Sequence, residues 1–583
     1  MDRLRQILAF LRPYKRPLVL AIVLTGALTL VGMAPPLLMR RLITDVAGEG
    51  EWGPFPLLMT LLFAVPLLRA GINAANSIAL NRVAQGIIRD TRRRLFTHLM
   101  RLSMRFYDET PVGAIHQRLT GDVANISTVA TGGVVTLSTD VLAVGFAVVV
   151  MLGLSPKLSL LTFALLPLYF LNYRFFSHRI QAANAQLRSR MDHISSMLQE
   201  RLSAHELIQS YGQEKAQATH FSSQAKSIMD AAVRGSAYSI SFNQLSAFIN
   251  KLGNTAIYGA GCYFFVRGAM AYGDVVAFCA YATQLLGPVV RLSSVMNQLA
   301  QVGVSVDRVD EILSRRPAIQ ERPDATAAAE LQGTVRIRGL TFGYEKDSPV
   351  LQDLDLEVPA GADLALVGAA GSGRSTLAML LRRFYEPQEG AIEVDGQDIR
   401  GLRLQDYRRA LALVLPDSAI LDGTIRENLR YGKPDAPTER VVEVAEAVGL
   451  HSFVASLPEG YETRLGTGGI ALSAGVRQQI GIARALLSEP FILIMDEATA
   501  SLDPDSAEAV NQAVRQAMAQ RTCILIVHRM LMARDADRVT VLHEGQVAEE
   551  GTHEELIARQ DGLYRTLYAL QYGEQRLPPA QER

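Results

Sequence analysis

Long apolar segments dominate the first half of the chain, and polar stretches separate them. Six segments reach the length of about 20 helical residues that a bilayer crossing needs. They lie near 17–39, 56–79, 131–155, 157–177, 243–266 and 273–297. The connections after the second and fourth segments are long, polar and helical in pattern, whereas those after the first, third and fifth are short. The pattern predicts a six-helix, all-α transmembrane domain with two long loops, over residues 1–313.

The second half of the chain has a different pattern. Residues 314–333 carry prolines and mixed charge without an apolar period, which predicts a linker. Beyond it, short β-branched runs such as DLALVG, FILIMDE and TCILIVH alternate with helical patterns. This alternation predicts an α/β domain with a largely parallel sheet over residues 334–583.

The basic residues predict how the apolar segments are oriented. The connection after the second segment holds a cluster of arginines, whereas the short loops hold few; the cluster comprises Arg82, Arg89, Arg92, Arg93, Arg94, Arg101 and Arg105. The positive-inside rule therefore places both long loops and both termini in the cytoplasm. We expect a multi-pass protein of the cell inner (cytoplasmic) membrane. The basic N-terminus has no cleavage site and suits a short helix on the membrane surface.

Composition narrows the classes of function. The net charge is zero, so nothing in the overall charge favours a nucleic-acid partner. The cysteines Cys262, Cys279 and Cys523 form no CxxC or CxxH spacing, so neither a disulfide framework nor a zinc site is expected.

Three ionisable residues fall inside the apolar segments: Arg69, Asp140 and Lys251. Each is costly in contact with lipid, so each is expected to face the bundle interior or an aqueous cavity. They either line a path for a polar cargo, or they reach the membrane surface and pair between helices. The sequence leaves both interpretations open.

A glycine-rich loop follows the apolar run DLALVG and precedes a helical pattern. This order of strand, glycine loop and helix is the context of a phosphate-binding loop. Glycines let backbone N–H groups curl round the phosphates, and the helix N-terminus adds its dipole. An ordinary glycine turn is the alternative for this loop taken alone. The candidate phosphate ligands are Gly368, Gly371, Ser372, Gly373, Arg374, Ser375 and Thr376, with the Ser375 hydroxyl as a candidate Mg²⁺ ligand.

Two further runs end in residues that suit phosphoryl transfer. The run ILIM is followed by Asp496, a candidate Mg²⁺ ligand, and by Glu497, which could orient and polarise the attacking water. The run ILIV ends at His528, which could contact the developing charge on the γ-phosphate. Together with the glycine loop, these residues predict ATP hydrolysis with Mg²⁺, with Glu497 and His528 as the catalytic candidates.

Ordered motifs along nearly the whole chain resemble one family. They are RFYDETPVGAIHQRLTGDVANI (105–126), SVDRVDEIL (305–313), GTIRENL (423–429), LSAGVRQQ (472–479) and ATASLD (498–503). In this order and spacing, the chain resembles an ATP-binding-cassette (ABC) transporter half of the exporter type (type IV). The resemblance implies a P-loop ATPase domain of the α/β class with an ABC-type helical subdomain, fused to the transmembrane domain.

The resemblance also implies a mechanism. Two cassettes would meet head to tail, with each ATP held between the phosphate loop of one chain and the signature of the other. Tyr344 would stack on adenine, and Ser473 and Gly475 of the signature and Asp503 of ATASLD would complete the sites. Coupling helices near 108–118 and 200–210 would transmit cassette closure to the membrane helices. Export is the default direction, although some members of this architecture import siderophores.

Four departures from the family pattern fall on one functional surface. Arg374 replaces the loop lysine, and its planar guanidinium is bulkier than an ammonium, so weaker or misplaced phosphate contact is expected. Pro416 stands where the family usually has a glutamine that contacts Mg²⁺ and water. Ala474 and Val476 alter the signature, which reads LSAGV. Residues 466–469 read GTGG where the family commonly has a glutamate and an arginine that bridge to the coupling helices.

The departures bear on the expected partner. A homodimer would combine Arg374 with LSAGV in both sites, whereas a different half could supply an intact signature. We therefore favour a heterodimer with a second ABC half-transporter and keep a homodimer possible. A membrane regulator or scaffold without turnover is the rival interpretation, and the membrane segments argue against a soluble DNA-repair cassette. The cargo stays open between a small molecule, a peptide and a lipid.

Overall fold

The computed structural model describes residues 12–128, 132, 134–328, 331–345, 347–416, 418–466, 468–496, 521–527 and 530–572. The chain divides into two compact units. The first comprises Met1–Met100 and Val112–Arg315, and the second comprises Arg101–Pro111 and Arg316–Arg583. The short segment Arg101–Pro111 therefore packs with the second unit, although sequence of the first unit flanks it on both sides.

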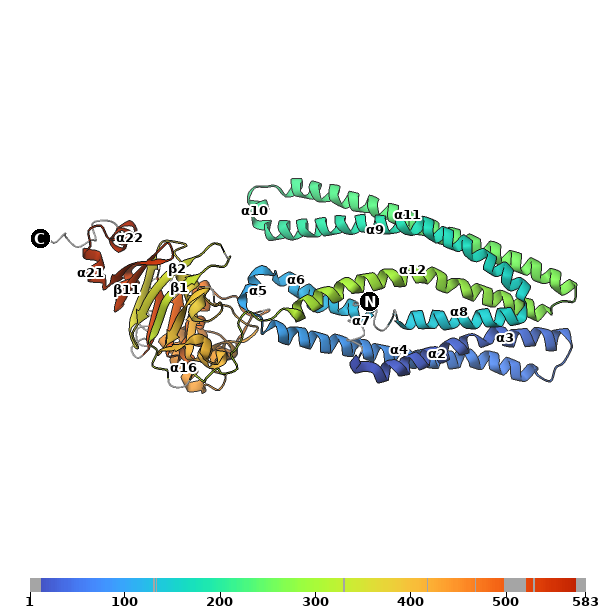
Figure 1. Ribbon diagram of the computed structural model, residues 1–583, viewed down its shortest axis with the longest axis horizontal. Helices are drawn as coiled ribbons and strands as arrows, with labels where there is room; N and C mark the ends of the chain where they lie inside the picture. The colour runs from blue at the N-terminus through green and yellow to red at the C-terminus, as the bar shows by residue number, and fades with distance from the viewer. Residues whose placement is uncertain are drawn as a thin grey trace. The chain divides into compact units, whose positions relative to one another are not determined.

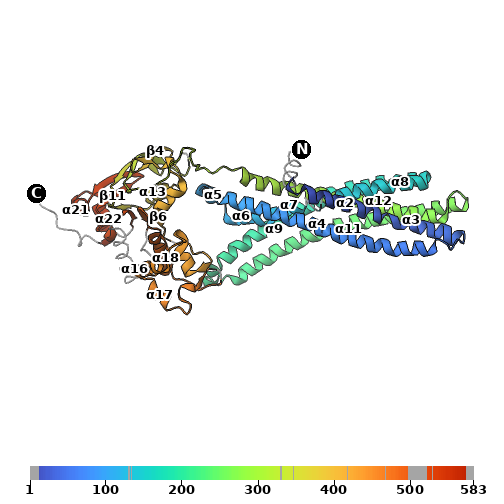
Figure 2. The same ribbon diagram turned by 90° about the horizontal axis from the view of Figure 1, so that it is seen from below.

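The first unit is built from long helices that run side by side (Figures 1 and 2). They are α2 (Lys15–Gly32), α4 (Phe55–Leu99), α8 (Val134–Leu154), α9 (Pro156–Ser203), α11 (Glu214–Val266) and α12 (Tyr272–Ser314). The short helix α3 (Ala34–Arg41) follows α2. Shorter helices join them: a π-helix (Leu42–Gly48), α6 (Val112–Gln117), a second π-helix (Arg118–Asp122), α7 (Val123–Thr128) and α10 (His205–Ser210). The two long polar connections are helical, as their pattern predicted.

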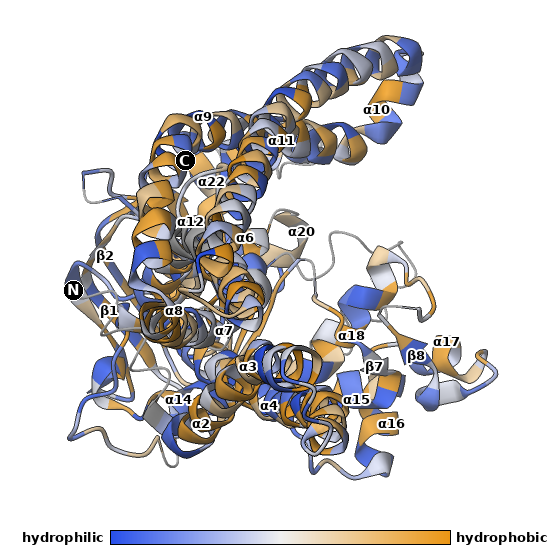
Figure 3. Ribbon diagram, turned by 90° about the vertical axis from the view of Figure 1, so that its right-hand side faces the viewer, coloured by the Kyte–Doolittle hydropathy of each residue, from blue (hydrophilic) through white to orange (hydrophobic). Residues whose placement is uncertain are grey.

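Within the described residues, four helical stretches are long and apolar enough to cross a membrane. They are Lys15–Gly48, Phe55–Leu99, Thr136–Leu154 and Pro156–Ser203. They contain the first, second and fourth predicted segments and most of the third, 131–155. The predicted segments 243–266 and 273–297 lie in α11 and α12, so the sixfold crossing stays a prediction. Hydrophobic residues are spread round these helices (Figure 3), and large apolar side chains such as Phe63, Leu67 and Leu171 are exposed. An apolar exterior suits contact with lipid.

Buried polar side chains tie neighbouring helices of the first unit together. The amide nitrogen of Asn76 donates to the hydroxyl of Thr25 at 3.0 Å, which links α4 to α2. The amide of Asn172 donates to Ser246 at 2.8 Å and links α9 to α11. Such bonds add modest stability between helices surrounded by lipid.

The second unit contains a six-stranded sheet of order β12-β11-β3-β10-β9-β6. All neighbours are parallel except β11 and β12, so the predicted largely parallel α/β sheet is confirmed. The strands are β3 (Asp363–Gly368), β6 (Leu411–Val414), β9 (Ile492–Asp496), β10 (Thr522–Ile526), β11 (Arg538–His543) and β12 (Gln546–Gly551).

Two smaller sheets and several helices complete the second unit. An antiparallel sheet has the order β2-β1-β4-β5, from β1 (Val335–Phe342), β2 (Leu351–Val358), β4 (Glu389–Val394) and β5 (Gln397–Asp398). β7 (Gly423–Thr424) and β8 (Arg464–Leu465) form a two-stranded ribbon. The helices include α5 (Met104–Glu109), α13 (Arg374–Leu381), α14 (Leu404–Ala410), α15 (Ile425–Leu429), α16 (Thr438–Ala447), α17 (His451–Ala455), α18 (Ala474–Leu487), α20 (Met530–Ala533), α21 (His553–Ala558) and α22 (Leu563–Tyr572).

The six-stranded sheet separates two hydrophobic cores. Alternate residues of β3 enter different cores, with Leu364 and Leu366 in one and Ala365 and Val367 in the other. This is the period of two that a strand buried on both faces requires. Because β3, β10 and β9 are parallel neighbours, their carboxyl ends meet at one edge. Ligands of open α/β sheets bind at such an edge.

Candidate functional site

The glycine loop connects the end of β3 to the start of α13. Gly371 and Gly373 have φ angles of +82° and +99°, which side chains other than glycine rarely adopt. A Cβ on Gly368 would lie 2.3 Å from the carbonyl oxygen of Leu542 and 2.7 Å from Ser372 Oγ. The loop therefore needs its glycines for its own geometry, and it leads into the N-terminus of α13, where the helix dipole favours an anion.

Two hydroxyl groups beside the loop suit the binding of a phosphorylated ligand. Ser372 is 5% exposed, and its hydroxyl has no hydrogen-bond partner among the described residues. A buried polar atom of this kind is costly unless it meets a ligand or a water. Ser375 lies in the first turn of α13 and is exposed, so its hydroxyl is accessible to a cation.

Arg374 is the buried cation of the loop. Its side chain is 6% exposed, and Nη1 donates to the carbonyl oxygen of Val527 at 2.8 Å. Val527 follows β10, so the guanidinium reaches the carboxyl end of the strand beside β3. The bond holds the guanidinium of Arg374 at the edge where the parallel strands end. At least one of its N–H groups is therefore bound to an acceptor of the protein itself.

Asp496 is the last residue of β9 and is 4% exposed. It is in register with Ile526 of β10, and Ile526 is in register with Leu366 of β3. The structure therefore brings Asp496 and the glycine loop to the same edge, on either side of β10. Glu497, Asp503 and His528 lie outside the described residues.

Tyr344 marks the other end of the site. Its hydroxyl lies 3.3 Å from Thr376 Oγ1, which is in the second position after the start of α13. Its ring packs edge to face against Phe342 and Tyr385, with centroids 5.2 and 5.3 Å away. Tyr344 is 44% exposed, so part of its surface remains accessible to a ligand.

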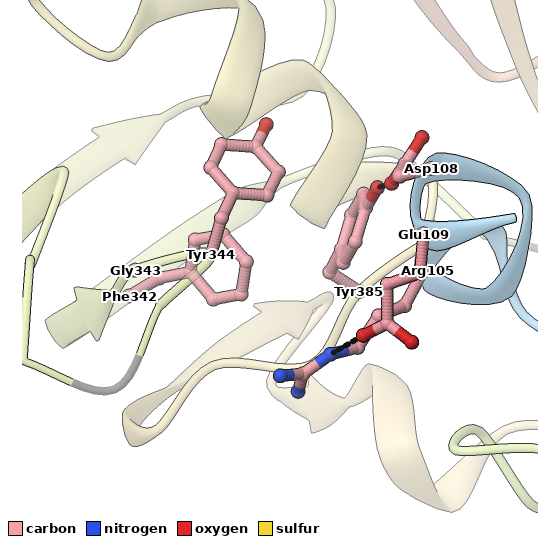
Figure 4. A pocket seen from close by; sticks show the side chains of 7 residues that line it. All are labelled: Arg105, Asp108, Glu109, Phe342, Gly343, Tyr344 and Tyr385. Carbon is pink, nitrogen blue, oxygen red and sulfur yellow. Dashed lines mark hydrogen bonds and ion pairs between the residues drawn. The ribbon is translucent and has the colours of Figure 1, made fainter.

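A pocket of about 160 Å³ lies between these rings and the segment Arg101–Pro111 (Figure 4). In Figure 4 the rings of Tyr344 and Tyr385 stand on two sides of it, and Asp108 approaches the Tyr385 hydroxyl. That hydroxyl donates to Asp108, and Arg105 donates to Glu109 at 3.1 Å. Burial first, and then the hydrogen bond to Asp108, raise the pKa of Tyr385, so the phenol keeps its proton at neutral pH.

The signature residues lie at the start of α18. Ser473 caps the helix, because its Oγ accepts a hydrogen bond from Val476 N at 3.2 Å. Ser473 and Ala474 are exposed and Gly475 is half-buried. This helix end is therefore open to a ligand or to a facing subunit. Further along α18, buried Gln478 donates to the carbonyl of Leu415, next to the exposed Pro416.

The structure requires glycine at two positions of the GTGG stretch, residues 466–469. Gly466 has φ of +85°, and its Cβ would lie 2.8 Å from Asp422 Cα. A Cβ on Gly469 would lie 2.4 Å from the carbonyl oxygen of Arg464. The ribbon of β7 and β8 is thus too tight here for side chains. Thr467 lies outside the described residues.

The sequence predicted the phosphate loop, Asp496 and Tyr344 as parts of one site, with the signature completing the site of a facing chain, but it did not predict the pocket's other walls. Phe342 and Tyr385 were not singled out, and Asp108 and Glu109 were read only as part of the coupling region. The available signal was the repeated tripeptide Arg-Phe-Tyr, which occurs at 105–107 and again at 383–385. It gives no indication that these two places lie together.

Comparisons with known proteins find matches along nearly the whole chain. The family models "ABC transporter transmembrane region" and "ABC transporter" match residues 18–289 and 351–500. The chain is 33% identical to the uncharacterized ABC transporter ATP-binding protein YknV of Bacillus subtilis, over 97% of this chain and 94% of the relative. It is 32% identical to the ATP-dependent lipid A-core flippase of Desulfotalea psychrophila, over 96% and 97%.

Two further matches extend over almost the full length. The putative multidrug export ATP-binding/permease protein YgaD of Bacillus subtilis is 31% identical, over 98% of this chain and 100% of the relative. The structure of a bacterial Atm1-family ABC exporter with ATP bound superposes with a TM-score of 0.81 at 28% identity, covering 97% of this chain and 99% of that one. The chain therefore belongs to the ABC transporters, as an exporter-type half-transporter in which a transmembrane region and an ABC ATPase domain are fused.

Proposed function

We propose that this chain is one half of a dimeric exporter and that the phosphate loop of this chain binds ATP weakly. ATP-driven transport follows from the family, and the weakened site is the finer part of the proposal. The observation that carries it is the buried guanidinium of Arg374, which donates to the carbonyl of Val527. This bond fixes the orientation of the planar fork, so the remaining N–H groups can meet a phosphate only from that orientation. A flexible ammonium has no planar fork to align and would be free of this constraint.

The remaining residues take the roles that their positions support. Ser375 and Asp496 would hold Mg²⁺, which supplies charge neutralisation of the phosphates, and hydroxyl and carboxylate oxygens are the ligands it prefers. Backbone N–H groups of the loop would bind the phosphates, and Tyr344 would stack on the base. Glu497 would orient the attacking water, and His528 would contact the γ-phosphate. Ser473 and Gly475 would act on the ATP held by the facing subunit, with Asp503 near the same interface.

A second ABC half-transporter is the proposed partner. The start of α18 is exposed, with Ser473 as its cap, which suits a surface that another cassette completes. In a homodimer both sites would combine Arg374 with the altered signature. We therefore favour a heterodimer, in which the partner's signature would face this chain's loop. This chain's LSAGV would face the partner's loop and would weaken that site as well. The dimer would lie in the cytoplasmic membrane with both termini of this chain inside.

The cargo is proposed to be an amphipathic molecule with a polar or charged group. Relatives named as a lipid A-core flippase and as a putative multidrug exporter favour a substrate that partitions into the bilayer. Within the bundle, the guanidinium of Arg69 lies close to Gly32, and Asp140 is 8% exposed. Charged groups at membrane depth are candidate contacts for the polar part of such a cargo.

ATP turnover of the purified full chain in lipid nanodiscs, alone and with its native partner, tests this proposal. The partner is first identified by affinity capture from native membranes. We expect Arg374→Lys to raise the apparent affinity for ATP by about tenfold, because an ammonium is released from the Val527 carbonyl. Glu497→Gln provides the baseline without hydrolysis. If no complex hydrolyses ATP above this baseline, the transporter function is wrong.

A membrane regulator that binds ATP without turnover is the second candidate. Pro416 is exposed at the place where the family carries a glutamine side chain, and proline offers neither donor nor acceptor there. ATP binding without hydrolysis in every complex, together with ATP-dependent capture of another membrane protein, would favour this function.

A further inference from the structure

The pocket beside Tyr344 has two chemically different ends. Phe342, Tyr344 and Tyr385 give it aromatic walls, whereas Arg105, Asp108 and Glu109 form a charged end. All six residues belong to the second unit, because Arg101–Pro111 packs with it. Aromatic walls and a few polar groups at one end are typical of sites for flat heterocycles with hydrogen-bonding edges.

The pocket is placed to take the base of a nucleotide held at the glycine loop. Tyr344 belongs to the pocket wall, and its hydroxyl also reaches Thr376 at 3.3 Å, in the first turn of α13. The volume of about 160 Å³ is close to the roughly 150 Å³ that holds one benzene ring, so the pocket would take one ring of a purine and leave the other outside it. One ligand could thus place its phosphates at the loop and stack its base on the exposed part of the Tyr344 ring, with one edge of the base toward Tyr385 and Asp108.

The charged end of the pocket favours a ligand base that presents a hydrogen-bond donor there over one that presents an acceptor. One guanidinium stands against two carboxylates, so the end is net negative. Arg105 is engaged by Glu109 at 3.1 Å, which leaves Asp108 as the carboxylate whose charge is not compensated by a cation in the pocket. Asp108 accepts from the neutral hydroxyl of Tyr385. A carboxylate can accept up to about four hydrogen bonds, so Asp108 can accept one more from a ligand.

We propose that Asp108, positioned by the hydroxyl of Tyr385, reads the edge of the purine base and makes this site selective for adenine over guanine. Adenine carries an exocyclic amino group at position 6, which can donate to the carboxylate. Guanine carries a carbonyl oxygen there, which the carboxylate repels, and it could donate to Asp108 only by turning its N1–H and 2-amino edge toward it. The inference rests on the proposed nucleotide site and adds a base-specific contact from the segment Arg101–Pro111.

Binding of ATP and GTP to the full chain in nanodiscs tests the proposal. We expect ATP to bind about tenfold more tightly than GTP, because a hydrogen bond to a charged group has about this effect. Asp108→Asn should bring the ratio of the two affinities to about one, because an amide can also donate to a carbonyl. Tyr385→Phe keeps the aromatic wall and should reduce the ratio partially. Asp561→Asn, an exposed site in a turn before α22, is the matched control and should leave the ratio unchanged.

The outcomes separate this inference from the proposed function. If the unmodified chain binds ATP and GTP equally, or if Asp108→Asn leaves the ratio of the two affinities unchanged, the proposed recognition of the base by Asp108 is wrong. The nucleotide site itself would not be contradicted. If the chain binds neither nucleotide, the nucleotide site itself is wrong. Thermal melting of each variant checks that it is folded.

Photolabelling of the unmodified chain with 8-azido-ATP gives a second test that needs no substitution. Trypsin would release residues 106–118, which contain Asp108, and 384–400, which contain Tyr385. Label in the peptide 106–118 that excess ATP removes and excess GTP does not would support the proposal. Label that is absent from both peptides would overturn it.

Discussion

Arg374 affects both the stability of the fold and the binding of ATP, and substitution should change the two in opposite directions. Its bond to the Val527 carbonyl stabilises the end of β10 and, in our proposal, holds the guanidinium back from phosphate. Arg374→Lys is expected to lower the free energy of unfolding without nucleotide by about 1 kcal/mol, because a buried carbonyl loses its donor. The same variant should bind ATP more tightly. Thermal unfolding with and without ATP measures both effects, and a variant more stable than the unmodified chain without nucleotide would contradict this account.

The carboxyl of Asp363 predicts how the stability of the chain depends on pH. Burial and the neighbouring charge of Asp537 raise the pKa of this carboxyl to about 6, from an ordinary value of 3.8. The folded state therefore prefers the protonated carboxyl. The contribution of Asp363 to the free energy of unfolding is full below pH 3.8 and is lost as the pH rises through about 6. Asp363→Asn should raise stability at pH 7.5 by about 1 kcal/mol, a value discounted for partial exposure.

The gain from Asp363→Asn should be smaller at pH 5, where part of the carboxyl is already protonated. Thermal melts of the full chain at both pH values measure the difference, with Asp561→Asn as the exposed control. Equal gains at the two pH values would show that the carboxyl does not titrate as described.

At the scale of elements, the antiparallel sheet beside the phosphate loop contains a matched pair of glycines. Gly390 and Gly396 both have positive φ angles, +81° and +78°. A Cβ on Gly390 would lie 2.4 Å from the carbonyl oxygens of Arg338 and Gly339, whereas a Cβ on Gly396 meets no heavy atom of the described chain within 4 Å. Gly390 thus allows β4 to approach the irregular part of β1.

The two alanine variants should therefore differ. Gly396→Ala is expected to cost about 1 kcal/mol, from the backbone conformation alone. Gly390→Ala is expected to cost about 3 kcal/mol or more, because backbone atoms that cannot move aside would clash with the new methyl group. Chemical denaturation measures both, and similar costs would mean that β4 and β1 can separate easily.

The elements also show why sequence reasoning succeeded where it did. Strands such as DLALVG and ILIMD are local apolar runs, and the glycine loop is contiguous, so its geometry is encoded within a few residues. The hydrogen bond between Tyr385 and Asp108 joins residues 277 positions apart, and no local pattern marks such a pair. The direction of the Arg374 side chain likewise depends on Val527, which follows a strand distant in sequence. Segments 243–266 and 273–297 are helical, as predicted, and their crossing of the membrane stays a prediction.

At the scale of the whole molecule, the chain passes between its two units three times, on either side of Arg101–Pro111 and again near Arg315. Cleavage after Arg315 would therefore cut only one of the three connections. We expect the two fragments to co-elute in size-exclusion chromatography after mild trypsin treatment in nanodiscs. The double variant Asp108→Ala and Tyr385→Phe should release the C-terminal fragment more readily. An ATPase fragment that elutes alone from the unmodified chain would contradict this expectation.

The placement of Arg101–Pro111 has a practical consequence for work on the soluble half. A protein expressed from the linker onward would keep the phosphate loop, α18 and Tyr344, and it would look complete by its motifs. It would nevertheless lack Arg105, Asp108 and Glu109, and Phe342 and Tyr385 would meet water instead. Nucleotide preferences measured on such a fragment would describe a base site with one side missing, and adding a peptide of residues 101–111 in trans would be the way to restore it.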